Sequence, residues 1–95
     1  MKTKVIFRKI GRKDPDIIAF FPELPGDSNP FRTCLCYEHM GQHGSATLDF
    51  YRFTLPASEE ECKDLKAELE SIGYDLRVCK HMANKDTYTR VKACK

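Results

Sequence analysis

Two cysteines and two histidines stand close together near the middle of the chain, at Cys34, Cys36, His39 and His43. Zinc prefers thiolate and imidazole ligands, so these four side chains are the best metal-ligand set in the sequence. Their spacing is unfavourable, because residues two apart on a strand share a face, whereas tetrahedral sites usually take ligand pairs from turns. We therefore expect no metal and no cofactor, and keep this set as an alternative hypothesis.

The same cluster contains the groups needed for cysteine-dependent catalysis. An imidazole lowers the pKa of a neighbouring thiol and accepts its proton, so Cys36 would need His39 or His43 within hydrogen-bond reach. The chain contains no C-x-x-C redox motif, nucleophile elbow or protease signature. An enzyme that uses Cys36, His39 and His43 is thus the alternative hypothesis, and the main one has no catalytic residue.

Basic residues gather near both ends of the sequence. Six lysines and arginines precede the first acid and six follow Asp75, although the formal net charge is only +2. Strands from the two ends, placed side by side, would form a positive surface for phosphates, with aromatic rings available to stack on bases. We expect nucleic acid to be the leading partner other than protein. The residues expected to bind it are Lys4, Arg8, Arg77 and Lys80.

A capped helix over residues 58–72 is the best-defined of the elements that must position these groups. Ser58 and Glu61 have the spacing of a capping box, and Gly73 supplies a left-handed residue to end the helix. Apolar residues recur at intervals of three and four, which predicts one buried face. They are Cys62, Leu65, Leu69 and Ile72.

Strands are predicted on both sides of this helix, over residues 2–10, 16–21, 31–38 and 74–79. The run DIIAFF is apolar on both faces, so it needs cover above and below. Residues 46–55 fit either a strand or a short helix, and we favour the helix because it would supply cover.

Two polar stretches are expected to lie outside the sheet core. The glycine-rich residues 39–45 should break the third strand. The basic tail of residues 80–95 should be partly flexible, or add an edge strand over residues 87–93.

These elements predict a single α+β domain over residues 1–95, with a mostly antiparallel sheet of four strands. Their order is three strands, the short helix, the main helix 58–72 packed on one face, and a last strand. One long helix covers only one face of the central strand. The apolar runs IIAFF and LDFYRF therefore indicate either more helical cover or a homodimer.

The composition is that of a soluble globular domain, because 41% hydrophobic and 32% charged residues exclude a disordered chain. Apolar runs are too short for a membrane span or the core of a signal peptide, so we expect a cytoplasmic protein without membrane contact. The five cysteines follow neither a disulfide framework nor zinc-finger spacing, which fits reduced thiols.

The segments DIIAFFPELPGD, TCLCYEHMGQHGSA and LPASEEECKDLKAELESIGYDLRV together resemble a group of small bacterial proteins with the same segment order. The similarity spans residues 5–80 and implies a compact bacterial cytoplasmic domain. It brings no known activity, cofactor or catalytic residue, so no role is carried over to a numbered position.

We accordingly predict a small binding or accessory module that self-associates and binds nucleic acid. The alternative is an enzyme with a Cys/His pair between Cys34 and His43. No motif identifies a small-molecule ligand.

Overall fold

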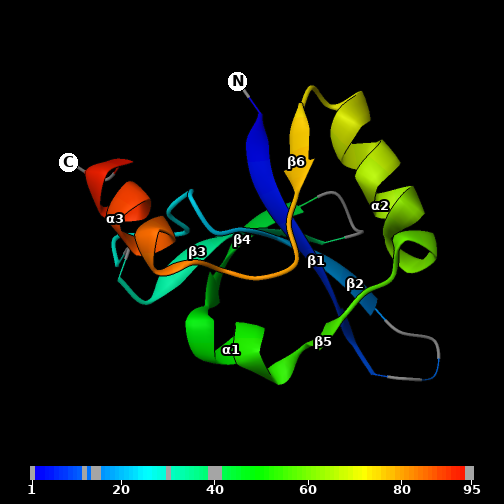
Figure 1. Cartoon of the computed structure of the whole chain (residues 1–95), viewed down its shortest axis with the longest axis horizontal. Helices are drawn as coiled ribbons and strands as arrows, with labels where there is room; N and C mark the ends of the chain where they lie inside the picture. The colour runs from blue at the N-terminus through cyan, green and yellow to red at the C-terminus, as the bar shows by residue number, and fades with distance from the viewer. Residues whose placement is uncertain (1, 12, 14–15, 30, 39–41, 94–95) are drawn as a thin grey trace.

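The computed structural model describes residues 2–11, 13, 16–29, 31–38 and 42–93 of the 95-residue chain. Its strands and helices form the predicted α+β fold, shown in Figure 1. The elements are β1 (Thr3–Ile10), β2 (Asp16–Phe21), β3 (Thr33–Glu38), β4 (Gln42–Thr47), α1 (Leu48–Phe53), β5 (Leu55–Pro56), α2 (Glu59–Ser71), β6 (Leu76–Val78) and α3 (Asn84–Ala93).

The strands form one mixed sheet in the order β4-β3-β2-β1-β5. Neighbours along this path are antiparallel, and β6 pairs in parallel with the first half of β1. β6 and β5 follow one another along the same edge of β1, because the carbonyls of Val5 and Phe7 accept hydrogen bonds from Cys79 and Ala57. The prediction of a mostly antiparallel sheet is confirmed.

The described part of the chain forms six strands, two more than the four predicted. β4 lies in the stretch whose glycines indicated a break, and it pairs with β3 along six residues. β5 is only two residues long. Both additions are edge pairings held by backbone hydrogen bonds, which side-chain composition does not reveal.

Helix α2 covers one face of the sheet, as predicted. The Ser58 hydroxyl accepts a hydrogen bond from the Glu61 N–H, and the Glu61 carboxylate accepts one from the Ser58 N–H, so the capping box is present. Gly73 ends the helix with a φ of +112°. Ile72 departs from the predicted apolar stripe, since it is the C-cap and is 53% exposed. The core under α2 contains Val5, Phe7, Ala19, Phe21, Tyr37, Cys62, Leu65, Leu69 and Leu76.

The opposite face of the sheet is also covered within the chain. Phe50 and Tyr51 of α1 pack on Phe20 of β2, with ring centroids 6.1 and 5.2 Å away. The predicted short helix within residues 46–55 is therefore confirmed. The same core contains Ile6, Ile18, Cys34, Cys36 and Ala46, with Cys79 and Met82 packed against it. β2 therefore has cover on both sides within one chain, whereas Phe53 of the LDFYRF run stays 84% exposed.

Residues 84–93 form helix α3, whereas the sequence indicated a partly flexible tail or an edge strand over residues 87–93. The residues that α3 buries are charged: Asp86 pairs with Lys4, and Arg90 Nη1 donates to the Pro22 carbonyl at 2.6 Å. In Figure 1, α2 stands to the right of the strands, α3 to the left and α1 below them. Polar groups attach α3 to the sheet, so the apolar periodicity that marks an amphipathic helix is missing from its sequence.

Candidate nucleic-acid interface

The sheet separates the predicted catalytic cysteine from its described histidine. In the β3–β4 register, His43 lies opposite Tyr37, whereas Cys36 lies opposite Gly44. Directly opposed residues share a face and adjacent residues alternate, so Cys36 and His43 point to opposite sides of the sheet. The predicted partner His39 lies outside the described residues. The structure therefore does not bring Cys36 and His43 together as a catalytic pair.

The two thiols in β3 are also poorly suited to nucleophilic or metal chemistry. Burial raises the pKa of Cys34 to about 12, and burial likewise raises the pKa of Cys36. The thiolate is the form that attacks and ligates, so both groups stay in the inactive thiol form at neutral pH. No cluster of three or more metal-binding side chains occurs in the parts of the chain that the structure describes. The alternative metal set therefore does not assemble from Cys34, Cys36 and His43.

His43 instead belongs to an aromatic group on the α2 side of the sheet. Its Nε2 lies 2.7 Å from Tyr74 Oη, a hydrogen bond whose direction depends on the imidazole tautomer. Its ring also packs edge-on against Tyr37, with centroids 4.8 Å apart. These contacts explain His43 as a residue that ties β4 to the loop after α2.

Lys4 and Arg8, predicted to bind nucleic acid, are occupied by contacts within the fold. Lys4 is 4% exposed, and its Nζ lies 2.8 Å from Asp86 Oδ2. Arg8 donates to the Thr54 hydroxyl at 2.9 Å and stacks over the Tyr51 ring at 4.8 Å. Contact with a phosphate would require breaking these interactions, so neither side chain belongs to the candidate nucleic-acid interface.

Arg77 and Lys80, the other two predicted residues, are exposed but do not lie on a uniformly basic surface. Arg77 approaches Glu23 at 3.6 Å. Lys80 lines a hollow of about 830 Å³ at the sheet edge, which Glu59 and Glu61 also line. Carboxylates beside Arg77 and Lys80 repel a polyanion, so these two residues are less favourable positions for binding nucleic acid than the sequence indicated.

The exposed side of α3 is the basic surface that the structure does provide. Lys85, Tyr88 and Lys92 follow one another at intervals of three and four, which places them on one face of the helix. All three are exposed, and Tyr88 is 78% exposed. The one acid of α3, Asp86, is 1% exposed and faces the other way, toward Lys4. This face, which we call the α3 basic face, offers two cations around a ring.

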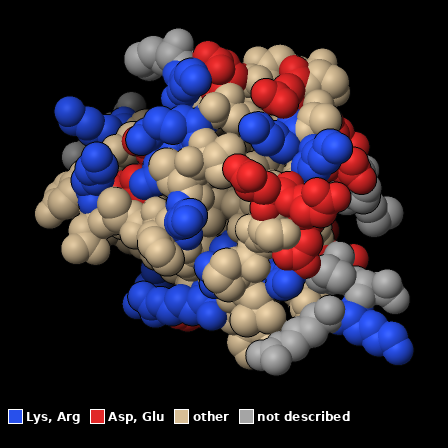
Figure 2. Space-filling view, turned by 45° about the vertical axis from the view of Figure 1, so that its right-hand side comes forward, with Lys and Arg blue, Asp and Glu red and all other residues tan. Residues whose placement is uncertain are grey.

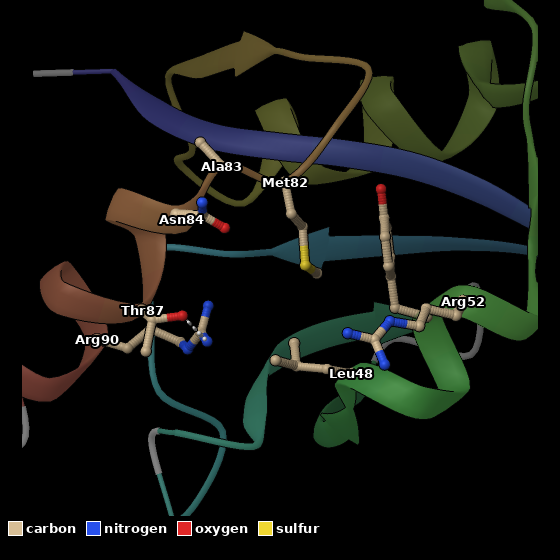
Figure 3. A pocket seen from close by; sticks show the side chains of 8 residues that line it. Leu48, Arg52, Met82, Ala83, Asn84, Thr87 and Arg90 are labelled. Atoms are coloured by element: carbon tan, nitrogen blue, oxygen red, sulfur yellow. Dashed lines mark hydrogen bonds between the residues drawn. The ribbon is translucent and has the colours of Figure 1, made fainter.

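A pocket of about 250 Å³ opens beside this helix, between α1 and α3. Arg52 of α1 and Arg90 of α3 point toward one another from its two sides in Figure 3. Arg90 Nη2 also donates to the Thr87 hydroxyl at 3.1 Å, and that contact is drawn in the same view. The pocket is lined by Leu48, Tyr51, Arg52, Met82, Ala83, Asn84, Thr87 and Arg90, none of which is an acid.

Acidic side chains lie mainly elsewhere on the surface. Helix α2 exposes several of them, and in Figure 2 most acidic groups occupy the right-hand half of the molecule, where α2 comes forward. Lysines and arginines are more numerous in the left-hand half. A polyanion therefore meets less repulsion at the α3 side of the molecule than at the α2 side.

Sequence reasoning missed Lys85, Lys92 and Arg52. The spacing of Lys85, Tyr88 and Lys92 was available as a signal, but it indicates one face only if the segment is helical. With an edge strand over residues 87–93, Lys85 would lie outside the element that contains Tyr88 and Lys92. Only the helical structure of residues 84–93 brings Lys85, Tyr88 and Lys92 onto one face.

The chain matches no family model, no curated protein and no solved structure in the three comparisons made. In the described residues, no helix is long and apolar enough to cross a membrane.

Proposed function

We propose that the protein is a small binding module that holds single-stranded nucleic acid on the α3 basic face. The observation that carries the proposal is the sorting of charge on α3: its acid is buried against Lys4, while Lys85, Tyr88 and Lys92 face outward. The helix thus presents cations and an aromatic ring without an exposed carboxylate between them.

The two lysines supply contacts to phosphates. Within the described residues neither Lys85 nor Lys92 forms an ion pair, so neither must give up a partner to bind. Each phosphate neutralised by a lysine releases condensed counterions, which favours binding at low salt. Thr89 and Asn84 add exposed polar groups on the same helix.

The ring of Tyr88 favours a single strand over a duplex. An exposed tyrosine can stack on an unpaired base, whereas bases in a duplex are already stacked on one another. Stacking is tolerant of sequence, so we expect low sequence preference. The partner would be met in a bacterial cytoplasm, which suits the four free thiols among the described cysteines.

Fluorescence anisotropy with labelled single- and double-stranded oligonucleotides tests the proposal. We expect the single strand to bind at low salt and the affinity to fall as salt rises, because counterion release contributes to binding. Tyr88→Ala should weaken binding by about 1–3 kcal/mol for each base stacked on the ring. Combined Lys85→Glu and Lys92→Glu should weaken binding further and flatten the dependence of affinity on salt.

The matched control is a charge reversal on the other side of the molecule. Lys63 is exposed on α2, among acidic residues, and Lys63→Glu changes the net charge as one α3 reversal does. If Lys63→Glu weakens binding as much as Lys85→Glu, the α3 basic face is not the interface. Absence of binding up to about 100 µM oligonucleotide at low salt would reject the proposal as a whole.

A further inference from the structure

We propose that the pocket between α1 and α3 binds a phosphate monoester, such as the phosphate at the end of a nucleic-acid strand. The phosphate chemistry follows from the lining of the pocket, whereas the assignment to a strand end rests on the proposed function. The pocket lies outside the α3 basic face, since Lys85, Tyr88 and Lys92 are not among its lining residues.

The lining of the pocket matches a doubly charged anion. Two guanidinium groups, from Arg52 and Arg90, approach from opposite elements, and no carboxylate belongs to the lining. The hydroxyl of Thr87 and the amide of Asn84 add neutral polar groups. Guanidinium groups bind phosphate oxygens through paired N–H donors, and a monoester presents more charge than a diester within the strand.

The two arginines differ in how they are held. Arg90 is 1% exposed and is fixed by its hydrogen bonds to the Pro22 carbonyl and the Thr87 hydroxyl. A buried cation acts on the pocket through a medium of lower dielectric constant than water. Arg52, with a side chain 77% exposed, stands at the mouth and can move onto an entering anion. The site thus combines a fixed positive charge with an adjustable one.

The pocket is large enough for a chemical group such as a phosphate, but small for a whole drug-sized molecule. Its volume of about 250 Å³ lies below the roughly 300–1,000 Å³ typical of small-molecule sites. The pocket is nevertheless several times larger than the roughly 30 Å³ that one water occupies in the liquid. A phosphate group with part of its attached sugar therefore fits these dimensions better than a complete nucleotide.

Asp49 is the internal competitor for Arg52. The two side chains approach at 3.4 Å, and both are mostly exposed. An exposed ion pair of this kind contributes little to stability, so a phosphate dianion can replace the carboxylate. Removing the charge of Asp49 should consequently strengthen phosphate binding, which is the opposite of the effect expected from removing Arg52.

The experiment compares one single-stranded oligonucleotide with a phosphate at its 5′ end, at its 3′ end or at neither. We expect one of the phosphorylated forms to bind the unmodified protein about tenfold more tightly than the unphosphorylated form, as one charge-assisted contact allows. Arg52→Ala should remove this difference, and Asp49→Asn should enlarge it. The control Lys63→Ala, on α2, should leave the ratio as it is.

Inorganic phosphate distinguishes the pocket from the nucleic-acid surface. It should raise the melting temperature of the unmodified protein more than chloride of equal ionic strength, and Arg52→Ala should abolish this rise. Oligonucleotide binding that ignores terminal phosphates, without a phosphate-specific rise in melting temperature, would overturn the pocket and leave the α3 basic face intact. A phosphate-specific rise without oligonucleotide binding would retain the pocket and reject the proposed function.

Discussion

The basic residues of β1 each hold a different part of the fold. Lys4 pairs with Asp86 of α3, and Lys9 pairs with Glu61 of α2 at 2.9 Å. Arg8 donates to the Thr54 carbonyl at 2.5 Å, immediately after α1. Lys4 and Arg8 lie on one face of the strand and Lys9 on the other, as alternation requires. The basic residues of β1, which suggested a binding site for a polyanion, therefore hold the three helices α1, α2 and α3 to the sheet.

Glu61 gives this arrangement a measurable dependence on pH. The hydrogen bond from Lys9, with that from the Ser58 N–H, lowers the pKa of Glu61 from 4.5 to about 2. A pKa lowered by folding means that the ionised carboxylate stabilises the fold above about pH 4.5, and that this stabilisation is lost as the pH falls toward about 2. Glu61→Gln should therefore lower the urea midpoint at pH 7, and the difference from the parent protein should shrink toward pH 2.

The control for this prediction is Glu70→Gln, which removes a carboxylate from an exposed position near the other end of α2. Its urea midpoint should follow that of the parent protein throughout the titration. A difference between Glu61→Gln and the parent that stays constant from pH 7 to pH 2 would contradict the ionic role of Glu61.

Helix α3 shows how an element can dock without an apolar face. Its attachment depends on the Lys4–Asp86 pair and on the bond from Arg90 to the Pro22 carbonyl. Asp86 also accepts a hydrogen bond from the Ala83 N–H at 2.7 Å, which satisfies a donor at the helix start. Lys4 and Asp86 satisfy each other and Arg90 is held by the Pro22 carbonyl, so that Lys85 and Lys92 are the charges of the helix that face water.

The Lys4–Asp86 pair should show strong coupling in a double-mutant cycle. Lys4→Met or Asp86→Leu alone leaves a buried charge without its partner and should cost about 3–5 kcal/mol of unfolding free energy. The double variant should cost much less than the sum of the two, because neither member of the pair is left buried without its partner. Urea unfolding of the parent protein, both single variants and the double variant measures this coupling.

Lys2→Met is the matched control, since Lys2 is exposed and precedes the same strand. It should change the unfolding free energy by less than about 0.5 kcal/mol. Single-variant costs at positions 4 and 86 that simply add in the double variant would show that the pair does not act as a unit.

The arrangement of the whole molecule weakens the reason that the sequence offers for self-association, because the apolar run of β2 is covered within the chain. α2 covers one face of β2, and α1 with the segment that precedes α3 covers the other. The largest exposed hydrophobic side chains are single positions such as Phe31 and Phe53 rather than the central sheet face. Scattered apolar residues of this kind are usual on the surfaces of monomers.

We therefore expect light scattering to give the mass of one chain, 11.0 kDa, across a wide range of concentrations. The physical reason is that the apolar sheet surface is already buried in each copy. A mass that approaches twice this value as the concentration rises would restore the homodimer. The edge of β4 with which no described strand pairs would then be the first surface to examine.

Local patterns in the sequence were sufficient for several elements. DIIAFF is a strand with the predicted bounds, because its apolar run and flanking turn residues are local signals. α2 begins at its predicted cap, since the Ser58–Glu61 pair acts within one turn. β4 and α3 were not recognised, because their stability comes from pairing with β3 and from charged contacts with distant residues.

The sequence by itself determined the α+β class, the capped helix and the doubly buried strand, because these follow from propensity and periodicity over neighbouring residues. Only the tertiary structure decided which charges are exposed. Lys4 and Asp86 are 82 positions apart, so no local pattern shows that they cancel each other. The strand register also decided that Cys36 and His43 cannot act as a pair. His43 lies opposite Tyr37, the neighbour of Cys36 in β3, and neighbouring residues of a strand point to opposite faces of the sheet.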